Sequence, residues 1–292
     1  MHICDNFNRL RPDGTILLTM KSIRLIVLAA AFAIPMAAQT GAPQLSHDDN
    51  VARPTPEYAQ VKMPANPALP SLWIVGDSTA QNKADLGWGD HFAHYVQTDR
   101  LNVVNRARAG RSSRTFIHEG AWDAVLRDMK PGDYVVIQMG HNDGGSLDGA
   151  KPRGTLKGIG EDQQEVTLLD GSHEVVHSFG WYLRKYIADA RAKGAHPMLM
   201  DLTVRNIWKD GRIERDMGYN DFIQQVAQAE HVPYIDMGTV EADRLEKLGQ
   251  EKTAALFPID HTHTSADGAE MVAECVAKAL RDEHNELAKY LK

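Results

Sequence analysis

The sequence predicts an α/β domain in which a parallel β-sheet is covered by helices on both faces. Short segments that are almost wholly apolar recur along the chain after residue 70, and amphipathic segments separate them. Strands that are apolar throughout are typical of a parallel sheet, because both of their faces are buried against helices. Ligands of such sheets bind at the carboxyl ends of the strands, so the loops there are the candidates for a functional site.

Five segments have the length and composition of buried strands: 72–75, 101–107, 133–140, 196–203 and 232–237. Helices are expected where apolar residues recur at helical spacing: 87–97, 122–129, 181–194, 220–231, 241–248 and 266–280. Gly194 is expected to end the third of these helices, since glycine is common just after a helix.

One connection, between residues 140 and 181, is unusually long and is rich in Gly, Asp and Lys. Connections of this length in compact domains are usually functional or disordered. Residues 165–179 alternate between polar and apolar around Asp170-Gly171, which predicts a β-hairpin. We expect the insertion, at about 144–180, to form a small ribbon beside the binding cleft.

Residues 1–38 are expected to lie outside the fold. A basic stretch that begins at Met20 is followed by an apolar run of 14 residues that ends in small residues at Ala38, the pattern of a secretory signal. Met20 is then the true start, with an upstream extension before it; a buried N-terminal helix is the alternative. The run is too short to span a bilayer. We therefore expect a secreted or periplasmic protein that leaves the membrane after cleavage.

Residues 39–70 contain six prolines and predict an extended or partly disordered lead-in to a domain at 71–292. The chain has a net charge of −7, and removing the leader, with its four basic and two acidic residues, takes it to −9. An acidic chain without a basic run is not expected to bind nucleic acid. Cys275 would be the single remaining cysteine, so no internal disulfide is expected.

Four loops at the predicted strand ends carry residues suited to catalysis: Ser78, Gly110, Asn142, and the pair Asp260 and His263. A serine becomes a good nucleophile when a base accepts its proton and that base is itself oriented. A tight turn would bring the carboxylate of Asp260 to Nδ1 of His263 and leave Nε2 facing Ser78. The backbone N–H groups of Ser78 and Gly110 and the side-chain amide of Asn142 would then stabilise an oxyanion.

Each of these residues alone has a simpler interpretation. Ser78, Gly110 and Asn142 are common turn residues, whereas Asp260 and His263 also occur at a capped helix start or as metal ligands. Their occurrence together at one edge of one predicted sheet favours the catalytic interpretation. Thr264 or Ser265, which follow directly, would cap the last helix and hold the turn rigid.

The motifs GDS at 76–78, Gly110 within RAGRSSR, GHND at 140–143 and DHTH at 260–263 resemble the four sequence blocks of the SGNH, or GDSL, hydrolases. The longer strings GDST, NRARAGRSSRTF, MGHNDGG and FPIDHTHTSADGAEMVAE are similar to the rhamnogalacturonan acetylesterases, and the resemblance runs from about 72 to 280. It implies a flavodoxin-like three-layer α/β/α sandwich with a five-stranded parallel sheet.

The resemblance also implies ester hydrolysis by Ser78, with His263 as base, Asp260 as its partner, and Ser78, Gly110 and Asn142 as the oxyanion hole. The substrate would be acetylated pectic polysaccharide, with rhamnogalacturonan first, and an acetyl-enzyme would be the intermediate. Four alternatives stay open: a xylan or oligosaccharide acetylesterase, a lipid acyl hydrolase, a non-catalytic carbohydrate-binding protein, and a metal-dependent hydrolase that uses Asp260, His261 and His263.

No phosphate loop, dinucleotide fingerprint or metal motif is apparent, so we expect no cofactor and no metal. His91 and His94 are three residues apart on a predicted helix, but no carboxylate or cysteine pattern completes a zinc site, so they are expected at or near the surface. His141 is expected to pack against the sheet edge and Asp143 to bond the loop backbone.

Two groups of residues are candidates for substrate binding. Arg108, Arg111 and Arg114 lie around Gly110 and are either solvated or attract the carboxylates of galacturonate. Asn206 and Trp208 follow the fourth predicted strand, where the indole either stacks on a sugar ring or covers the core.

Overall fold

The computed structural model of the chain describes residues 62–292, so the predicted signal segment and most of the proline-rich lead-in lie outside the described residues. Five parallel strands form the central sheet in the order β2-β1-β3-β6-β9. These are β1 (Ser71–Gly76), β2 (Asn102–Asn105), β3 (Tyr134–Gln138), β6 (His196–Met200) and β9 (Tyr234–Ile235). This strand order is that of the flavodoxin-like sheets, which confirms the predicted fold class.

Successive side chains of β1 point into two separate cores, because a strand presents alternate residues to opposite faces. Leu72 and Ile74 belong to one core, Trp73 and Val75 to the other. The first core is closed by α1 (Trp88–His91), the 3₁₀ helix η2 (Phe92–Tyr95), α6 (Met237–Leu248), α8 (Ala266–Asp282) and η3 (Glu286–Tyr290). The second is closed by α2 (Ser113–His118), α3 (Ala121–Asp128), α4 (Phe179–Ala192) and α5 (Asn220–Ala229).

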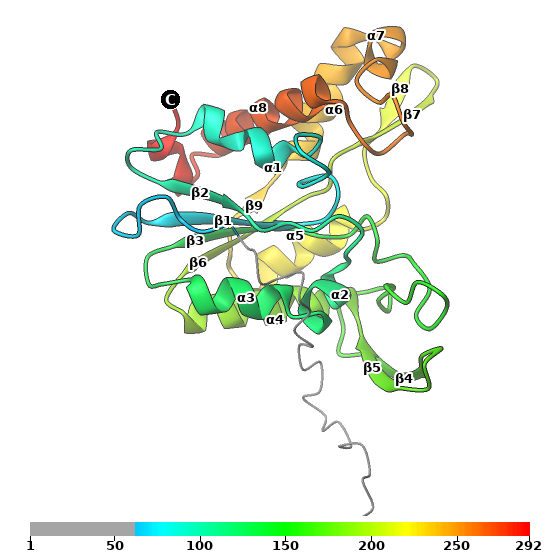
Figure 1. Cartoon of the computed structure of the whole chain (residues 1–292). Helices are drawn as coiled ribbons and strands as arrows, with labels where there is room; N and C mark the ends of the chain where they lie inside the picture. The colour runs from blue at the N-terminus through cyan, green and yellow to red at the C-terminus, as the bar shows by residue number, and fades with distance from the viewer. Residues whose placement is uncertain (1–61) are drawn as a thin grey trace, which may run out of the picture. The chain divides into compact units, whose positions relative to one another are not determined.

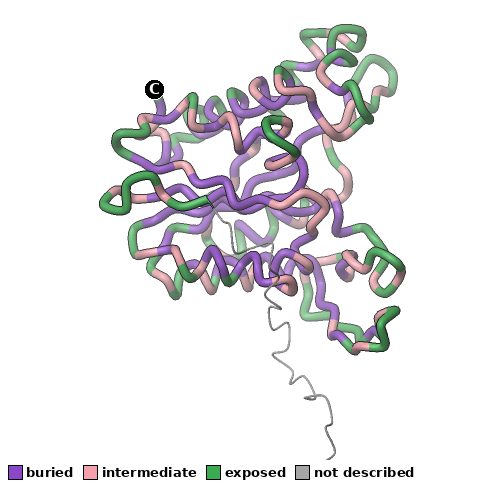
Figure 2. Tube along the Cα trace, in the orientation of Figure 1, coloured by how far each residue is buried: buried purple, intermediate pink, exposed green. Residues whose placement is uncertain are grey.

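The two sets of helices lie on opposite faces of the sheet (Figure 1), which gives the three-layer sandwich. Figure 2 shows the same arrangement as burial: the sheet is buried along its length, whereas exposed residues gather in the peripheral loops and hairpins. A short helix, α7 (Gln250–Ala254), follows α6. Within residues 62–292 no helix has both the length and the apolar character needed to cross a bilayer.

Several elements differ from the sequence-based expectation, including the short helices α7 and η3, which were not predicted. The helix expected at 87–97 is a short α-helix followed by a 3₁₀ turn that ends at Tyr95. Helix α2 was not predicted, although Ser112 and Thr115 form a capping box at its start. The hairpin of β7 (Arg205–Lys209) and β8 (Arg212–Glu214) was also missed; its turn residues Asp210 and Gly211 have φ of 51° and 77°.

The hairpin expected around Asp170-Gly171 is confirmed: β4 (Gln163–Thr167) pairs antiparallel with β5 (His173–His177). Helix α4 begins directly after it, where the Ser178 hydroxyl accepts a hydrogen bond from the backbone N–H of Trp181 at 3.1 Å. The insertion is therefore a loop and a ribbon joined to a well-capped helix.

Arg114 of α2 holds both parts of the insertion, and its side chain is 1% exposed. The guanidinium Nε and Nη2 donate to the two carboxylate oxygens of Glu174 in β5 at 2.8 and 2.6 Å. Its Nη1 donates to the backbone carbonyls of Leu147 and Gly154, each at 2.9 Å. A buried ion pair of this kind is tolerated only when it is fully hydrogen-bonded, as here. The hypothesis that Arg114 attracts substrate carboxylates is wrong, because the side chain is buried and fully used.

We expect Arg114→Ala to lower the free energy of unfolding by about 3–5 kcal/mol, because Glu174 would stay buried without its partner. Urea denaturation measures the change. Lys278→Ala is the matched control, since Lys278 and Asp282 form an exposed pair (2.5 Å) that contributes about 0.5 kcal/mol or less. Similar small losses in both variants would contradict the role assigned to Arg114.

Candidate active site

Ser78 lies in the turn directly after β1, and 9% of its surface is exposed. The preceding residue, Asp77, is fully buried and fixes this turn: its Oδ1 accepts hydrogen bonds from the backbone N–H and the hydroxyl of Thr79, both at 2.9 Å. The serine hydroxyl is therefore presented from a rigid turn at the carboxyl end of an inner strand.

The structure brings His263 and Asp260 to this hydroxyl. His263 Nε2 lies 2.9 Å from Ser78 Oγ, and His263 Nδ1 lies 2.7 Å from Asp260 Oδ2. Because a carboxylate only accepts hydrogen bonds, Nδ1 carries the ring proton and Nε2 presents its lone pair to the serine. This is the geometry in which an imidazole removes a proton from a hydroxyl.

Asp260 is held in its ionised form. Partial burial works against the charge, but hydrogen bonds from the His263 ring and from the backbone N–H groups of His263 and Thr262 outweigh it and lower the pKa of Asp260 to about 2. The two backbone hydrogen bonds to Asp260 Oδ1 measure 2.7 and 2.8 Å. A permanent carboxylate fixes the ring orientation of His263 and favours its protonation during a reaction.

Two hydrogen bonds hold the loop that carries His263 in place. The Thr264 hydroxyl donates to the carbonyl of Leu86 at 3.1 Å, which links it to the segment that follows Ser78. Ser265 caps α8 by accepting the backbone N–H of Gly268 at 3.2 Å, as expected. The base therefore sits between a capped helix and the segment that leads away from the nucleophile turn.

Three hydrogen-bond donors come from the neighbouring loops. Gly110 has φ of +79°, which residues with a side chain rarely adopt, so a glycine is needed there. Within the described part of the chain, the backbone N–H groups of Ser78 and Gly110 donate to no protein acceptor. Asn142 Nδ2 donates one hydrogen to the carbonyl of Arg111 at 2.8 Å, which leaves the second amide hydrogen for a ligand.

An ion pair beneath the nucleophile was not foreseen from the sequence. His141 Nδ1 lies 3.3 Å from Asp77 Oδ2, with a geometry short of a direct hydrogen bond, and the Thr203 carbonyl lies 3.2 Å from His141 Nε2. Burial opposes both charges, but their mutual attraction lowers the pKa of Asp77 and raises that of His141. The pair joins the Ser78 turn to the loop that carries Asn142.

Asp143 was expected to bond the loop backbone, but its carboxylate instead bonds the first residue of helix α2. Its carboxylate accepts the backbone N–H of Ser113 at 3.2 Å and the hydroxyl of Ser113 at 2.5 Å. Burial raises the pKa of Asp143 to about 7 despite these hydrogen bonds. The carboxyl group of Asp143 therefore holds the start of α2 in place, whereas the half-exposed Asp260 faces the catalytic histidine.

A cavity of about 360 Å³ borders Gly110. Two of the cationic side chains that line it, Lys151 and Arg153, were not predicted from the sequence. Its lining is Gly110, Arg111, Thr115, Glu119, Lys151, Pro152 and Arg153. Lys151 and Arg153 come from the insertion, and Arg153 Nη1 lies 3.4 Å from the carbonyl of Gly110. Arg111 Nε is paired with Glu119 at 2.7 Å. The clue in the sequence was the basic KPR string early in the insertion.

The other substrate-binding candidates have different surroundings. Arg108 is half-buried, and its backbone N–H donates to the carbonyl of Gly76 at 2.9 Å, but it does not line the cavity. Trp208 packs against the first core, and its indole N–H donates to Asn206 Oδ1 at 2.7 Å. Its packing against the core supports the interpretation that Trp208 covers the core.

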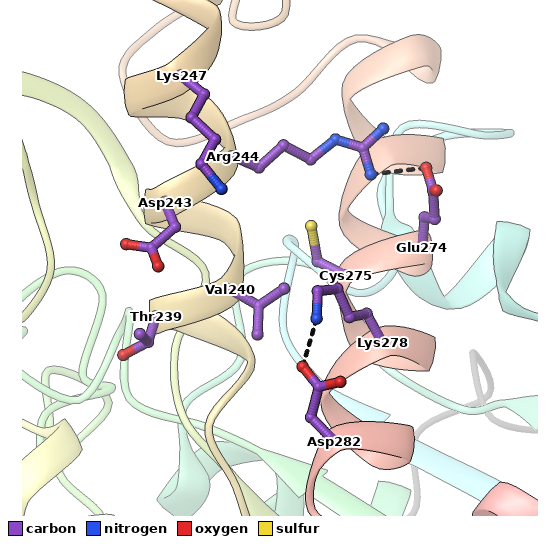
Figure 3. Close-up of a pocket in the computed structure, with 9 residues that line it drawn as sticks. All are labelled: Thr239, Val240, Asp243, Arg244, Lys247, Glu274, Cys275, Lys278 and Asp282. Atoms are coloured by element: carbon purple, nitrogen blue, oxygen red, sulfur yellow. Dashed lines mark hydrogen bonds and ion pairs between the residues drawn. The ribbon is translucent and has the colours of Figure 1, made fainter.

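A larger groove, of about 490 Å³, lies between α6 and α8 (Figure 3) and borders none of the residues around Ser78. Ion pairs cross and line it: Arg244 with Glu274 at 2.6 Å and Lys278 with Asp282 at 2.5 Å. Cys275 in its wall is buried, and burial raises the pKa of its thiol to about 12, so it is no nucleophile. This groove is therefore separate from the site around Ser78.

A serine, a histidine and an aspartate joined in series at the carboxyl edge of this sheet are the site of a serine-type hydrolase. The sequence profile of the GDSL-like lipase/acylhydrolase family matches residues 74–271. The chain belongs to this family, in the branch that includes the rhamnogalacturonan acetylesterases, and is a carboxylic ester hydrolase.

Its relatives in this branch cover most of the fold. The rhamnogalacturonan acetylesterase of Emericella nidulans is 35% identical to this chain, covering 72% of it and 84% of the relative. The probable rhamnogalacturonan acetylesterase YesY of Bacillus subtilis is 33% identical, covering 72% and 92%. RhgT of the same organism, also named a rhamnogalacturonan acetylesterase, is 32% identical, covering 72% and 89%.

Solved structures show the same fold. The protein YxiM of Bacillus subtilis superposes with a TM-score of 0.60 at 25% identity; the match covers 74% of this chain and 57% of that structure. A catalytic mutant of an acetylxylan esterase from Geobacillus stearothermophilus superposes with a TM-score of 0.50 at 17% identity, covering 78% and 98%.

The lowered pKa of Asp260 predicts a pH-dependent contribution to stability. Because this pKa is about 2 in the folded protein and 3.8 is the ordinary value, the stabilisation is complete above about pH 4 and is lost as the pH falls toward 2. The stability difference between the parent protein and Asp260→Asn, from urea denaturation, should therefore disappear across this window. Asp99→Asn is the control for loss of one exposed carboxylate, and a difference that persists at pH 2 would contradict the assignment.

Proposed function

We propose that the protein is an exported serine esterase that removes acetyl groups from a pectic polysaccharide, with rhamnogalacturonan as the first candidate. The observation that carries the proposal is the 2.9 Å contact between His263 Nε2 and Ser78 Oγ, which gives the serine a base. The specificity for acetyl esters rests on the three relatives at 32–35% identity that are named rhamnogalacturonan acetylesterases.

In the first half of the proposed reaction, Ser78 Oγ attacks the carbonyl carbon of the acetyl ester and His263 Nε2 accepts the serine proton. The oxyanion that forms accepts hydrogen bonds from the N–H groups of Ser78 and Gly110 and from the Asn142 amide. When the intermediate collapses, the bond to the sugar oxygen breaks and that oxygen takes the proton from His263. The sugar leaves as an alcohol and the acetyl group stays on Ser78.

In the second half, water attacks the acetyl carbon and gives its proton to His263. The same donors stabilise the second oxyanion. Collapse breaks the bond to Ser78 Oγ, which regains its proton from the imidazolium, and acetate leaves. Asp260 remains a carboxylate throughout and stabilises the charged ring at each step.

The cavity beside Gly110 supports an anionic polymer as substrate. Lys151, Arg153 and Arg111 line it, and cations of this kind bind the carboxylates of galacturonate residues. The chain as a whole has a net charge of −7, so the attraction for an anionic polysaccharide would be local to this cavity. A neutral polymer such as xylan would gain nothing from these charges.

Export is supported by the signal pattern of residues 20–38. Export would bring the enzyme to polysaccharides that are too large to enter a cell. N-terminal sequencing of protein recovered outside the cytoplasm would then begin at Gln39, and a retained Met20 in that fraction would contradict cleavage.

Ser78→Ala should lower kcat/KM for acetate release from acetylated rhamnogalacturonan and from p-nitrophenyl acetate by at least about 10⁴-fold, because it removes the hydroxyl that attacks the ester and carries the acetyl group. Ser172→Ala, which removes a serine from the tip of the β4–β5 hairpin, is the control and should retain parental activity. A Ser78→Ala protein that works at the parental rate would overturn the proposed mechanism.

Lys151→Ala should raise the KM for acetylated rhamnogalacturonan about 3- to 10-fold with little change in kcat, because Lys151 is exposed at the cavity rim and acts only by attraction. The KM for acetylated xylan should not change. Initial rates of acetate release on both polymers measure this, with Lys193→Ala as the control for loss of one lysine. Faster turnover of acetylated xylan than of acetylated rhamnogalacturonan by the parent enzyme would favour the alternative, a xylan acetylesterase.

A further inference from the structure

Two histidines that the sequence left without a partner meet a carboxylate from a distant helix. His91 ends α1, His94 lies in η2, and Glu270 lies in α8. The Nδ1 atoms of both rings point to the same oxygen, Glu270 Oε2, at 2.7 and 2.9 Å. One ligand atom from each of the three residues lies within 4.8 Å of the others.

The hydrogen bonds of His91 require a proton or a metal ion between its ring and Glu270. Its Nε2 lies 2.7 Å from the backbone carbonyl of Asp85, which only accepts, so Nε2 must carry a proton. In a neutral ring Nδ1 then has a lone pair, and that lone pair faces the carboxylate of Glu270. Two lone pairs face each other unless a proton or a metal ion lies between them.

The surrounding contacts are of the kinds that orient metal ligands in proteins. A histidine that ligates a metal usually donates its other ring N–H to a carbonyl or carboxylate, as His91 does to Asp85. The ligating carboxylate is usually oriented by a further donor, and the Tyr95 hydroxyl donates to Glu270 Oε1 at 2.7 Å. With their other atoms bonded in this way, Nδ1 of His91 and Oε2 of Glu270 face each other at 2.7 Å.

The dimensions suit a tetrahedral zinc ion after a small adjustment. Bonds of about 2.0–2.1 Å place the ligand atoms about 3.3 Å apart, so each imidazole must withdraw from Glu270 by about half an ångström. The side chain of His94 is 65% exposed and is free to move by this much. Its exposure also leaves an open side for a water molecule as fourth ligand.

We propose that His91, His94 and Glu270 bind a divalent transition metal, with Zn²⁺ as the ion that two imidazoles and one carboxylate suit best. His91 and His94 follow the loop that begins at Ser78, and Glu270 belongs to the helix that begins just after His263. A bound metal would therefore fasten together the two segments that supply the nucleophile and the base. This site departs from the sequence-based expectation of no metal, and it does not depend on the proposed substrate.

The test uses the full chain without a histidine tag, treated with EDTA and dialysed, and titrated with ZnCl₂ in a calorimeter. We expect one equivalent of Zn²⁺ to bind to the parent protein, and zinc at 100 times the Kd to raise the Tm by about 5–10 °C. His94→Ala and Glu270→Gln should each weaken binding by at least about tenfold. His94→Ala alters only an exposed side chain, so it tests the site even if Glu270→Gln folds poorly.

Two controls separate this site from other histidines. His173→Ala removes an exposed histidine of β5. His263→Ala removes the histidine that zinc would need if it bound at the active site instead. Neither substitution should change the zinc Kd. Anomalous scattering at the zinc edge should place the ion between the Nδ1 atoms of His91 and His94. Failure of the parent protein to bind one equivalent, parental affinity in His94→Ala, or loss of binding in His263→Ala would each overturn the proposal.

Discussion

The hydrogen bond between Ser78 Oγ and His263 Nε2 joins residues 185 positions apart, and the chemistry depends on it. The sheet order puts the end of β1 between β2 and β3, so loops from both neighbours reach the serine. The capped start of α8 and the hydrogen bond from Thr264 to Leu86 bring the base to the same point. The nucleophile and the base are far apart in the sequence and belong to different elements. The topology of the sheet is what brings them together.

Carboxyl groups around this contact differ in charge because their surroundings differ. Asp260 is half-exposed and receives three hydrogen bonds, so its pKa falls to about 2 and it stays ionised. Asp143 is wholly buried, and its pKa rises to about 7. Asp77 is equally buried but faces His141, whose charge lowers its pKa. Burial without a cation gives a structural carboxyl group, whereas hydrogen bonds or a cation preserve the charge that a serine hydrolase needs beside its base.

Much of this arrangement could be predicted from the sequence, and what was missed has a physical reason. The five strands were visible because they are largely apolar, and the order of the loops after them placed Ser78 and Asn142 at one edge. The three-residue spacing of Asp260 and His263 indicated their contact because it is local. The pairing of Arg114 with Glu174, or of His91 with Glu270, could not be read in this way, since it depends on how an insertion and a helix dock in three dimensions.

The most direct measurement of the central claim is covalent labelling of the active protein with a serine-directed organophosphate, followed by mass spectrometry of its peptides. The reagent reacts fast only with a serine whose proton is taken by a neighbouring base. The account predicts one modified residue, Ser78, in step with loss of activity, and no comparable labelling in a His263→Ala protein. Labelling of a different serine as activity is lost, or equal labelling of Ser78 without the histidine, would contradict it.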